Sequence, residues 1–268
     1  MSNAGGGNGP VTVQQIWDWL DSFAPFATQE AFDNAGLVIG DPSATVECVL
    51  FALDATLPVV REAQTLGVQL MVTHHPLLFG GIRQLRTDRP EGAAVAAIAG
   101  SGLNLIAAHT NFDQAPGGTG DSLASALGLA AILPTPGTPY LRTGFLPAPM
   151  RAADFLADVD RRLGACARLY GDPQMTLHRV AVGPGACGDA VALAAADGAQ
   201  AYVVGEIKHH ELLEAQGLGL TVLEAGHGCT EQPGITALYQ RFLSDAQAGH
   251  WPVQAHLTAI RPCGCTTA

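Results

Sequence analysis

Short apolar segments alternate with amphipathic segments along most of the chain, and this alternation narrows the folds open to it more than any other feature. Apolar runs typical of buried strands occupy residues 46–54, 68–75 and 103–110, and similar runs return at 178–185, 199–206, 220–227 and 253–260. Segments with helical spacing lie between them. Because helices and strands take turns, we predict an α/β fold in which helices cover a sheet.

The predicted helices have recognisable starts and stops. Thr12 is a suitable N-cap for the first one, and Thr56, Pro58 and Gly67 are a suitable cap, first-turn residue and stop for the second. Further helices are expected over residues 91–101, 121–128, 152–164, 189–198, 207–217 and 233–246. Residues 130–150 are rich in Pro, Thr and Gly, which favours a connection over a core element.

The second half of the chain echoes the first. Sliding residues 49–72 along by 131 positions gives seven identities, where about two would be expected by chance in a sequence so rich in Ala, Val and Gly. The expected strands and helices align as well. We therefore predict an internal duplication with two α/β lobes, residues 11–128 and 129–262.

Charge and cysteine content exclude some classes of function. The net charge of −11 argues against a nucleic-acid partner, which would need a basic surface. The six cysteines include no C-x-x-C pair and suggest reduced thiols in a cytoplasmic protein. We interpret the segment with Cys263 and Cys265 as a frayed terminus and not as a metal site. The opening residues do not resemble a signal peptide, and no run of about 18 apolar residues predicts a membrane helix.

Histidines and carboxylates gather at the ends of predicted strands. His74 and His75 end one apolar run, and two later runs each end in a histidine that precedes a carboxylate by four positions. In open α/β sheets, ligands bind at the edge where such strands emerge into loops. The six candidate metal ligands are His74, His75, His109, Asp113, His227 and Glu231.

The adjacent histidines favour two metal ions over one. Consecutive extended residues point to opposite sides of a strand, and Pro76 favours an extended conformation at His75. Two such imidazoles reach separate ions more readily than one shared ion, and a carboxylate such as Asp113 or Glu231 can bridge the pair. Imidazole and carboxylate ligands without thiolate suit Zn, Mn, Fe, Co or Ni, and composition does not choose among these.

Each candidate also has a simpler interpretation. A histidine such as His74 is more often a hydrogen-bonded core residue than a ligand, Asp113 could cap a turn, and Glu231 could begin a helix, where its charge suits the dipole. His209 and His210 are expected to open a helix near the same sheet edge, and contact with a substrate is open for both.

Five segments together resemble the Nif-three-like family, whose members are often named as homologues of a type-2 GTP cyclohydrolase I. They are DNAGLVIGD, THHPLLFG, AAHTNFDQAPGGTGDSLASALGL, GEIKHH and GHGCTE, in that order, and the resemblance spans residues 11–259. It implies a duplicated fold of intertwined lobes with mixed sheets, a toroidal homohexamer, and a dinuclear metal site. The family ligands correspond to His74, His75, Asp113, His227 and Glu231, with Glu231 a bridge and His109 a weaker or outer ligand.

The sequence departs from the family pattern at two places. Phe32 stands where a tryptophan is usual, and Cys229 stands where an aromatic residue is common, so Cys229 could be a reactive thiol. Some members carry a ferredoxin-like insert, but residues 114–178 are too few to hold one in addition to the elements assigned there.

Two classes of function remain open. The first is a metal-dependent hydrolase acting on a nucleotide-like or phosphorylated small molecule, in which Glu231, His210 and Glu206 move protons or orient the substrate. The second is a metal-binding adaptor or regulatory ring without catalysis. The sequence does not choose between them.

Overall fold

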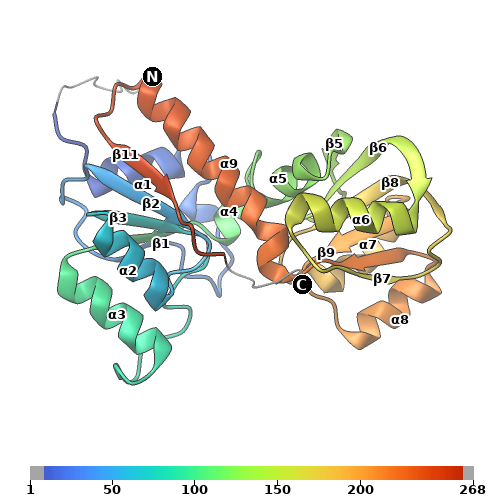
Figure 1. Cartoon of the computed structure of the whole chain (residues 1–268), viewed down its shortest axis with the longest axis horizontal. Helices are drawn as coiled ribbons and strands as arrows, with labels where there is room; N and C mark the ends of the chain where they lie inside the picture. Colours follow the sequence, from blue (N-terminus) through green and yellow to red (C-terminus); the bar gives the residue numbers. More distant parts are fainter. Residues whose placement is uncertain (1–8, 262–268) are drawn as a thin grey trace. The chain divides into compact units, whose positions relative to one another are not determined.

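The computed structural model describes residues 9–261, which form an α/β structure with two mixed sheets, as predicted (Figure 1). The chain packs into two compact units. The first contains residues up to 112 together with 235–261, and the second contains residues 113–234. These bounds differ from those of the predicted lobes, 11–128 and 129–262, because the end of the chain packs with the first sheet. The assignment of lobes stays a prediction.

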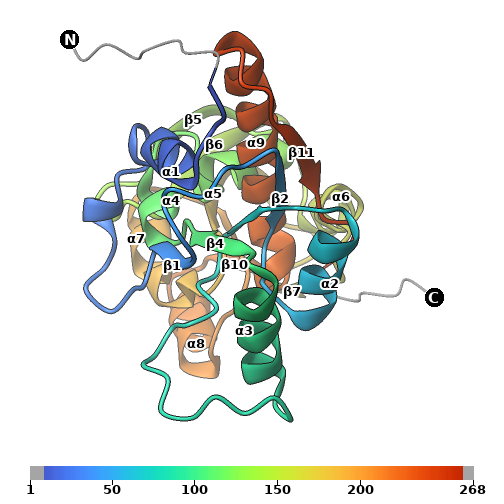
Figure 2. The same cartoon turned by 90° about the vertical axis from the view of Figure 1, so that its left-hand side faces the viewer.

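The first unit is built on a five-stranded sheet with the spatial order β1-β4-β3-β2-β11 (Figure 2). Its strands are β1 (Gly36–Ile39), β2 (Cys48–Ala52), β3 (Leu70–Thr73), β4 (Asn104–Ala107) and β11 (Gln254–Leu257). Only β1 is antiparallel to its neighbour. Strands β2, β3 and β4 are buried at every position, as parallel strands covered on both faces should be. Their carboxyl ends share one edge of the sheet.

Helices cover both faces of this sheet. They are α1 (Val13–Asp21), η1 (Phe26–Thr28), α2 (Leu57–Thr65), α3 (Pro90–Ser101) and the later part of α9 (His227–Ala248). Thr12 caps α1 as predicted, and Gln15 completes a capping box with it. Helices α2 and α3 cover one face (Figure 1). On the other face, the rings of Phe51 and Phe242 lie 5.3 Å apart.

The second unit is built on a six-stranded sheet with the order β5-β6-β8-β9-β10-β7. Its strands are β5 (Ala130–Pro134), β6 (Arg142–Arg151), β7 (Arg168–Tyr170), β8 (Thr176–Gly183), β9 (Ala201–Val204) and β10 (Thr221–Glu224). Strands β8, β9 and β10 are parallel, and the other pairings are antiparallel. The carboxyl ends of the three parallel strands again share one edge.

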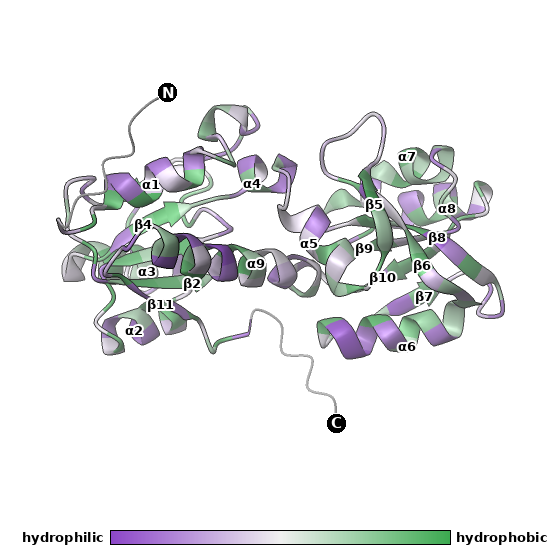
Figure 3. Cartoon of the chain, turned by 90° about the horizontal axis from the view of Figure 1, so that it is seen from above, coloured by the Kyte–Doolittle hydropathy of each residue, from purple (hydrophilic) through white to green (hydrophobic). Residues whose placement is uncertain are grey.

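Helices also cover both faces of the second sheet, with α6 on the side opposite α7 and α8 (Figure 3). They are α4 (Thr110–Gln114), which begins in the first unit, α5 (Thr119–Ala126), α6 (Ala152–Leu163), η2 (Cys187–Ala190), α7 (Val191–Ala196) and α8 (His209–Gly217). Phe155 of α6 packs in one core cluster, and Tyr202 of β9 packs with α7 and α8 in another.

The register of the parallel strands matches the 131-residue repeat. Val49 pairs with Leu70 in the first sheet, and Val180 pairs with Ala201 in the second, so both partners differ by 131 positions. In each sheet, an antiparallel strand lies outside the third parallel strand. This shared arrangement is what an internal duplication would produce.

The prediction of a connection over 130–150 is wrong, because β5 and most of β6 lie there. Buried polar residues concealed β6. The guanidinium of Arg142 donates to Asp121 and to two backbone carbonyls, and the hydroxyl groups of Thr143 and Thr135 lie 2.8 Å apart. Strand β5 is an edge strand, where Pro134 is tolerated. Helix α9 also begins at His227, six residues before the predicted start, and β7 and α4 were not predicted.

Among residues 9–261, no helix has the length and apolar character needed to cross a bilayer. The opening segment of the sequence and the pair Cys263 and Cys265 lie outside the described residues.

Candidate metal centre

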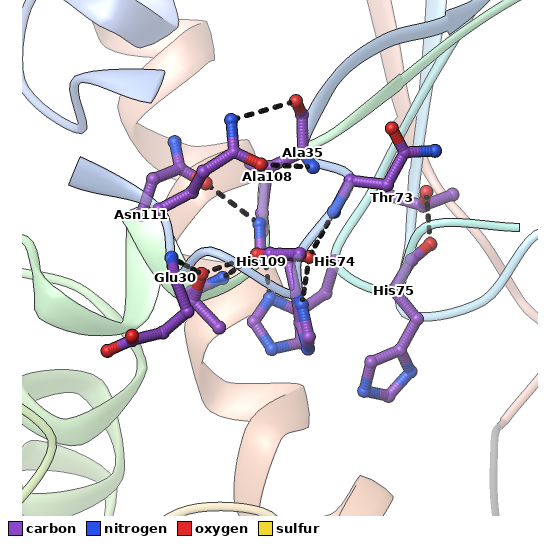
Figure 4. Close-up of polar contacts among 12 residues, drawn as sticks. Glu30, Ala35, Thr73, His74, His75, Ala108, His109 and Asn111 are labelled. Atoms are coloured by element: carbon purple, nitrogen blue, oxygen red, sulfur yellow. Dashed lines mark hydrogen bonds and ion pairs between the residues drawn. The ribbon is translucent and has the colours of Figure 1, made fainter. Parts of the chain in front are cut away.

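Three histidines meet at the carboxyl edge of the first sheet (Figure 4). His74 and His75 follow β3, and His109 follows β4. Each offers a ring nitrogen, and these nitrogens all lie within 4.8 Å of one another. The ring centroids are 5.0 to 5.6 Å apart. A set of three imidazoles at this spacing could hold a metal ion.

The two adjacent histidines are not held on opposite sides of a strand, so that part of the sequence argument is wrong. Strand β3 ends at Thr73, and the chain bends through His74 and His75. The Thr73 hydroxyl donates to the carbonyl oxygen of His75 at 3.0 Å and stabilises this bend. The alternation of side chains therefore stops before the pair, and both rings turn toward His109.

In each of the three histidines, Nδ1 lies 2.8 Å from an oxygen acceptor. The acceptors are the carbonyl of Ala108 for His74, Asp54 for His75, and Asp33 for His109. Because a carbonyl or carboxylate oxygen accepts a hydrogen bond, the neutral ring carries its proton on Nδ1 and its lone pair on Nε2. Acceptors of this kind fix the tautomer and orientation of metal-binding histidines. The donor set therefore fits a divalent ion bound through Nε2.

The sequence analysis missed Asp33, which orients His109. Its side chain has no exposed surface, and it also accepts hydrogen bonds from the amide and hydroxyl of Thr110. Burial alone would raise the pKa of Asp33, but the hydrogen bonds from His109 and Thr110 hold it well below its ordinary value. The carboxylate therefore stays ionised as an acceptor. It lies 76 positions from His109, a separation that no local pattern reveals.

Asp54 was also missed. It follows β2, which is parallel to β3, so its side chain emerges at the same sheet edge as His75. The position at the end of an apolar run was the signal that could have identified it, because the same rule had identified the histidines.

In the second unit, His227 and Glu231 lie one turn apart at the start of α9. The Nε2 of His227 is 3.1 Å from Oε1 of Glu231, whose side chain is 6% exposed. Nδ1 of His227 lies 3.3 Å from the carboxylate of Glu206. The predicted loop setting is therefore wrong, because a helical turn spaces the two candidate ligands. Glu206 contacts Nδ1 of His227 from a side chain that is 61% exposed, unlike the buried Asp33 beside His109.

Gly185 lies close against this pair. Its φ is +62°, and a Cβ placed on it would lie 2.2 Å from Oε1 of Glu231 and 3.3 Å from Nε2 of His227. The donor atoms thus face backbone that carries no side chain. A glycine here lets the Glu231 carboxylate approach the backbone more closely than a residue with a side chain would allow. The nitrogen and oxygen donors of the pair suit a divalent metal.

The remaining candidates have diverse settings. Asp113 lies in α4 and accepts a hydrogen bond from the Thr119 hydroxyl at 2.5 Å. His209 and His210 begin α8, as predicted, and the His210 side chain is 74% exposed. Cys229 is buried in a core cluster of the second unit, so its packing does not favour a reactive thiol.

The chain is similar to several known proteins along most of its length. A relative from Streptomyces coelicolor, named "GTP cyclohydrolase 1 type 2 homolog", is 35% identical over 92% of this chain and 90% of its own. A relative of the same name from Nostoc sp. is 35% identical over 87% of this chain and 92% of its own.

Solved structures share the fold. A Bacillus cereus protein related to NIF3 matches with a TM-score of 0.90 and 21% identity, over 96% of this chain and 99% of its own. A Staphylococcus aureus hypothetical protein matches with a TM-score of 0.90 and 26% identity, over the same shares. Two mixed sheets arranged in this way define a NIF3-type α/β protein. Residues 11–263 match the family described as Duf34/NIF3 (NGG1p interacting factor 3), and the chain belongs to this family.

Proposed function

We propose that this protein is a metal-dependent hydrolase with two divalent ions, acting on a nucleotide-like or phosphorylated small molecule. The observation that carries this proposal is the set of three histidines whose ring nitrogens lie within 4.8 Å, each with Nδ1 held by an oxygen. The names of the relatives, which refer to a GTP cyclohydrolase, support a nucleotide as substrate.

The proposed ligands are four imidazoles and two carboxylates, and Glu231 is the carboxylate that the family resemblance implies as a bridge. The ligands are His74, His75, His109, Asp113, His227 and Glu231. Divalent ions held by these residues would supply an activated water and would stabilise developing negative charge.

The chain's own residues divide the remaining work. The Glu206 carboxylate lies 3.3 Å from Nδ1 of His227, so we assign it a role in orienting that ring in addition to the predicted roles in proton transfer or substrate orientation. His210 is exposed at the start of α8, where it can donate a proton to a leaving group or bind a substrate oxygen. We further propose assembly into a homohexamer, as the resemblance implies.

The test combines metal analysis with an activity assay. The wild-type protein, loaded with zinc or manganese, is assayed on nucleotides, phosphoesters and cyclic amides beside Glu231→Gln. The matched control is Glu214→Gln, which changes an exposed glutamate on α8. We expect turnover that requires metal, is lost in Glu231→Gln and is retained in the control.

The alternative is a metal-binding adaptor, which the family description as an interacting factor favours. Full metal occupancy without turnover across the whole panel would support that alternative and contradict the hydrolase.

A further inference from the structure

Two neighbouring cavities lie in the first unit, and the larger one adjoins the histidine cluster. The larger has a volume of about 820 Å³ and is lined by His75, its partner Asp54, and Phe79. The smaller has a volume of about 130 Å³ and is lined by residues 81–86 with Arg89 and the start of α3. Gly81 and Glu91 line both cavities, so the two cavities lie next to each other.

The walls of the larger cavity suit a planar ring that donates hydrogen bonds. Most of its lining is apolar, and Phe79 is 52% exposed, with its ring 6.1 Å from Phe32 and 5.9 Å from His109. An exposed phenylalanine offers a surface for stacking. The charged side chains that line the cavity are the acceptors Asp54 and Glu91, with no lysine or arginine. This cavity therefore suits a base better than a phosphate.

The smaller cavity has the opposite character. The chain carries only 13 Lys and Arg residues in total, and three of them, Arg83, Arg86 and Arg89, line this cavity. Arg86 pairs with Asp88 at 2.6 Å. Among the residues that the structure describes, no acidic side chain pairs with Arg83 or Arg89. Two guanidinium groups without a counterion favour a phosphate ligand.

The backbone holds this arginine segment in place. A Cβ on Gly92 would lie 2.1 Å from the carbonyl oxygen of Arg86, so the segment packs directly on the start of α3. The Arg89 amide donates to the same carbonyl oxygen at 3.2 Å. The side chain of Asn34 donates to the carbonyl of Leu78 at 2.6 Å, and this bond fixes the chain beside Phe79. One anchored segment between β3 and α3 thus contributes to the walls of both cavities.

We infer that these cavities form one binding site for a nucleoside phosphate, with the base against Phe79 and the phosphate against Arg83 and Arg89. This inference rests on the proposed function for its substrate class, and it adds which residues recognise each part. A purine edge with adjacent N–H donors, such as that of guanine, matches the carboxylates of Asp54 and Glu91.

Calorimetric titration of the full chain with guanosine 5′-monophosphate and with guanosine tests the inference. We expect the wild-type protein to bind the monophosphate about tenfold more tightly than the nucleoside. The variant Arg83→Ala/Arg89→Ala should lose that difference and keep its affinity for guanosine. Phe79→Ala should lower the affinity for both ligands about tenfold. The control Arg61→Ala, an exposed position on α2, should change neither.

Equal affinity of the wild-type protein for the two ligands would overturn the inference. An equal loss of affinity for both ligands in the arginine variant would also overturn it. The same holds if the oligomeric mass of the arginine variant changes while its affinities for both ligands stay unchanged. The titrations are repeated on metal-free protein, where the phosphate preference should persist because Arg83 and Arg89 are not metal ligands. Failure of the metal proposal therefore remains distinguishable from failure of this one.

Discussion

Nδ1 of His109 lies 2.8 Å from Oδ1 of Asp33, and the Asp33 carboxylate is completely buried. A buried acceptor fixes both the tautomer of the imidazole and the direction in which Nε2 points. The same relation joins Asp54 to His75. The geometry of the histidine cluster thus depends on carboxylates that do not themselves belong to it.

Replacing Asp33 should weaken metal binding without removing a ligand. In Asp33→Asn, an amide replaces an ionised acceptor, and we expect a loss of metal affinity of about 10- to 100-fold. Competition titration with a chromophoric chelator measures this. Asp158→Asn, which changes a partly exposed ion pair on α6, should bind metal as the wild type does. Unchanged affinity in Asp33→Asn would show that the hydrogen bond does not orient a ligand.

Gly185→Ala should displace the Glu231 carboxylate from its position beside His227. The added methyl group would lie 2.2 Å from the Glu231 carboxylate, so the carboxylate must move. The positive φ adds a backbone cost of about 1 kcal/mol. Gly198→Ala is a matched control, because its φ is +77° and no atom lies within 4 Å of its Cβ position. Both variants should lose stability through the positive φ, but only Gly185→Ala should lose metal content. Equal metal content in the two would contradict this.

Acid should remove a contribution of Asp197 to stability. Burial opposes ionisation of this carboxyl group, but the Arg179 guanidinium, 2.8 Å away, and a hydrogen bond with Thr143 hold its pKa below the ordinary value. A lowered folded-state pKa stabilises the protein above the unfolded-state pKa, and this contribution disappears as the pH falls through the folded-state value. Asp197→Asn should therefore lower the free energy of unfolding by about 1 kcal/mol at pH 7.

Urea titrations at pH 7 and at about pH 3 measure the difference between Asp197→Asn and the wild type, which should shrink at the lower pH. A difference that grows on acidification would refute the assignment.

The cysteines should differ in reactivity. Burial raises the pKa of the Cys187 thiol, and nearby carboxylates, Asp113 among them, raise it further, whereas Cys166 is exposed. Cys229 is buried in the core. Peptide mapping after brief iodoacetamide treatment at pH 8 should find Cys166 modified, and Cys187 and Cys229 intact. Modification of Cys229 at the rate of Cys166 would restore the hypothesis of a reactive thiol there.

The sequence predicted the elements that carry regular apolar patterns and the ligands that follow them. Strands β2, β3 and β4 were recognised because continuous burial leaves uninterrupted apolar runs, and His74, His75 and His109 were found as their continuation. Strand β6 was missed because its buried Arg142 and Thr143 depend on partners distant in sequence. Pattern reading does not detect such pairs.

The local geometry of the site was less predictable for a related reason. Side-chain alternation applies only while a strand continues, and β3 ends one residue before His74. Asp33 and Asp54 contact their histidines across 76 and 21 positions. These relations arise only when the folded sheet brings separate loops to one edge.

Metal content of purified protein tests the central claim most directly. The wild type and a variant with His74, His75 and His109 all changed to alanine are equilibrated with zinc, desalted and analysed by elemental mass spectrometry. The control is His250→Asn, which changes an exposed histidine at φ +53° to asparagine, a residue that tolerates a positive φ. We expect two zinc ions per chain in the wild type and in the control, and the loss of at least one ion in the triple variant. Equal zinc content in the triple variant and the wild type would contradict it.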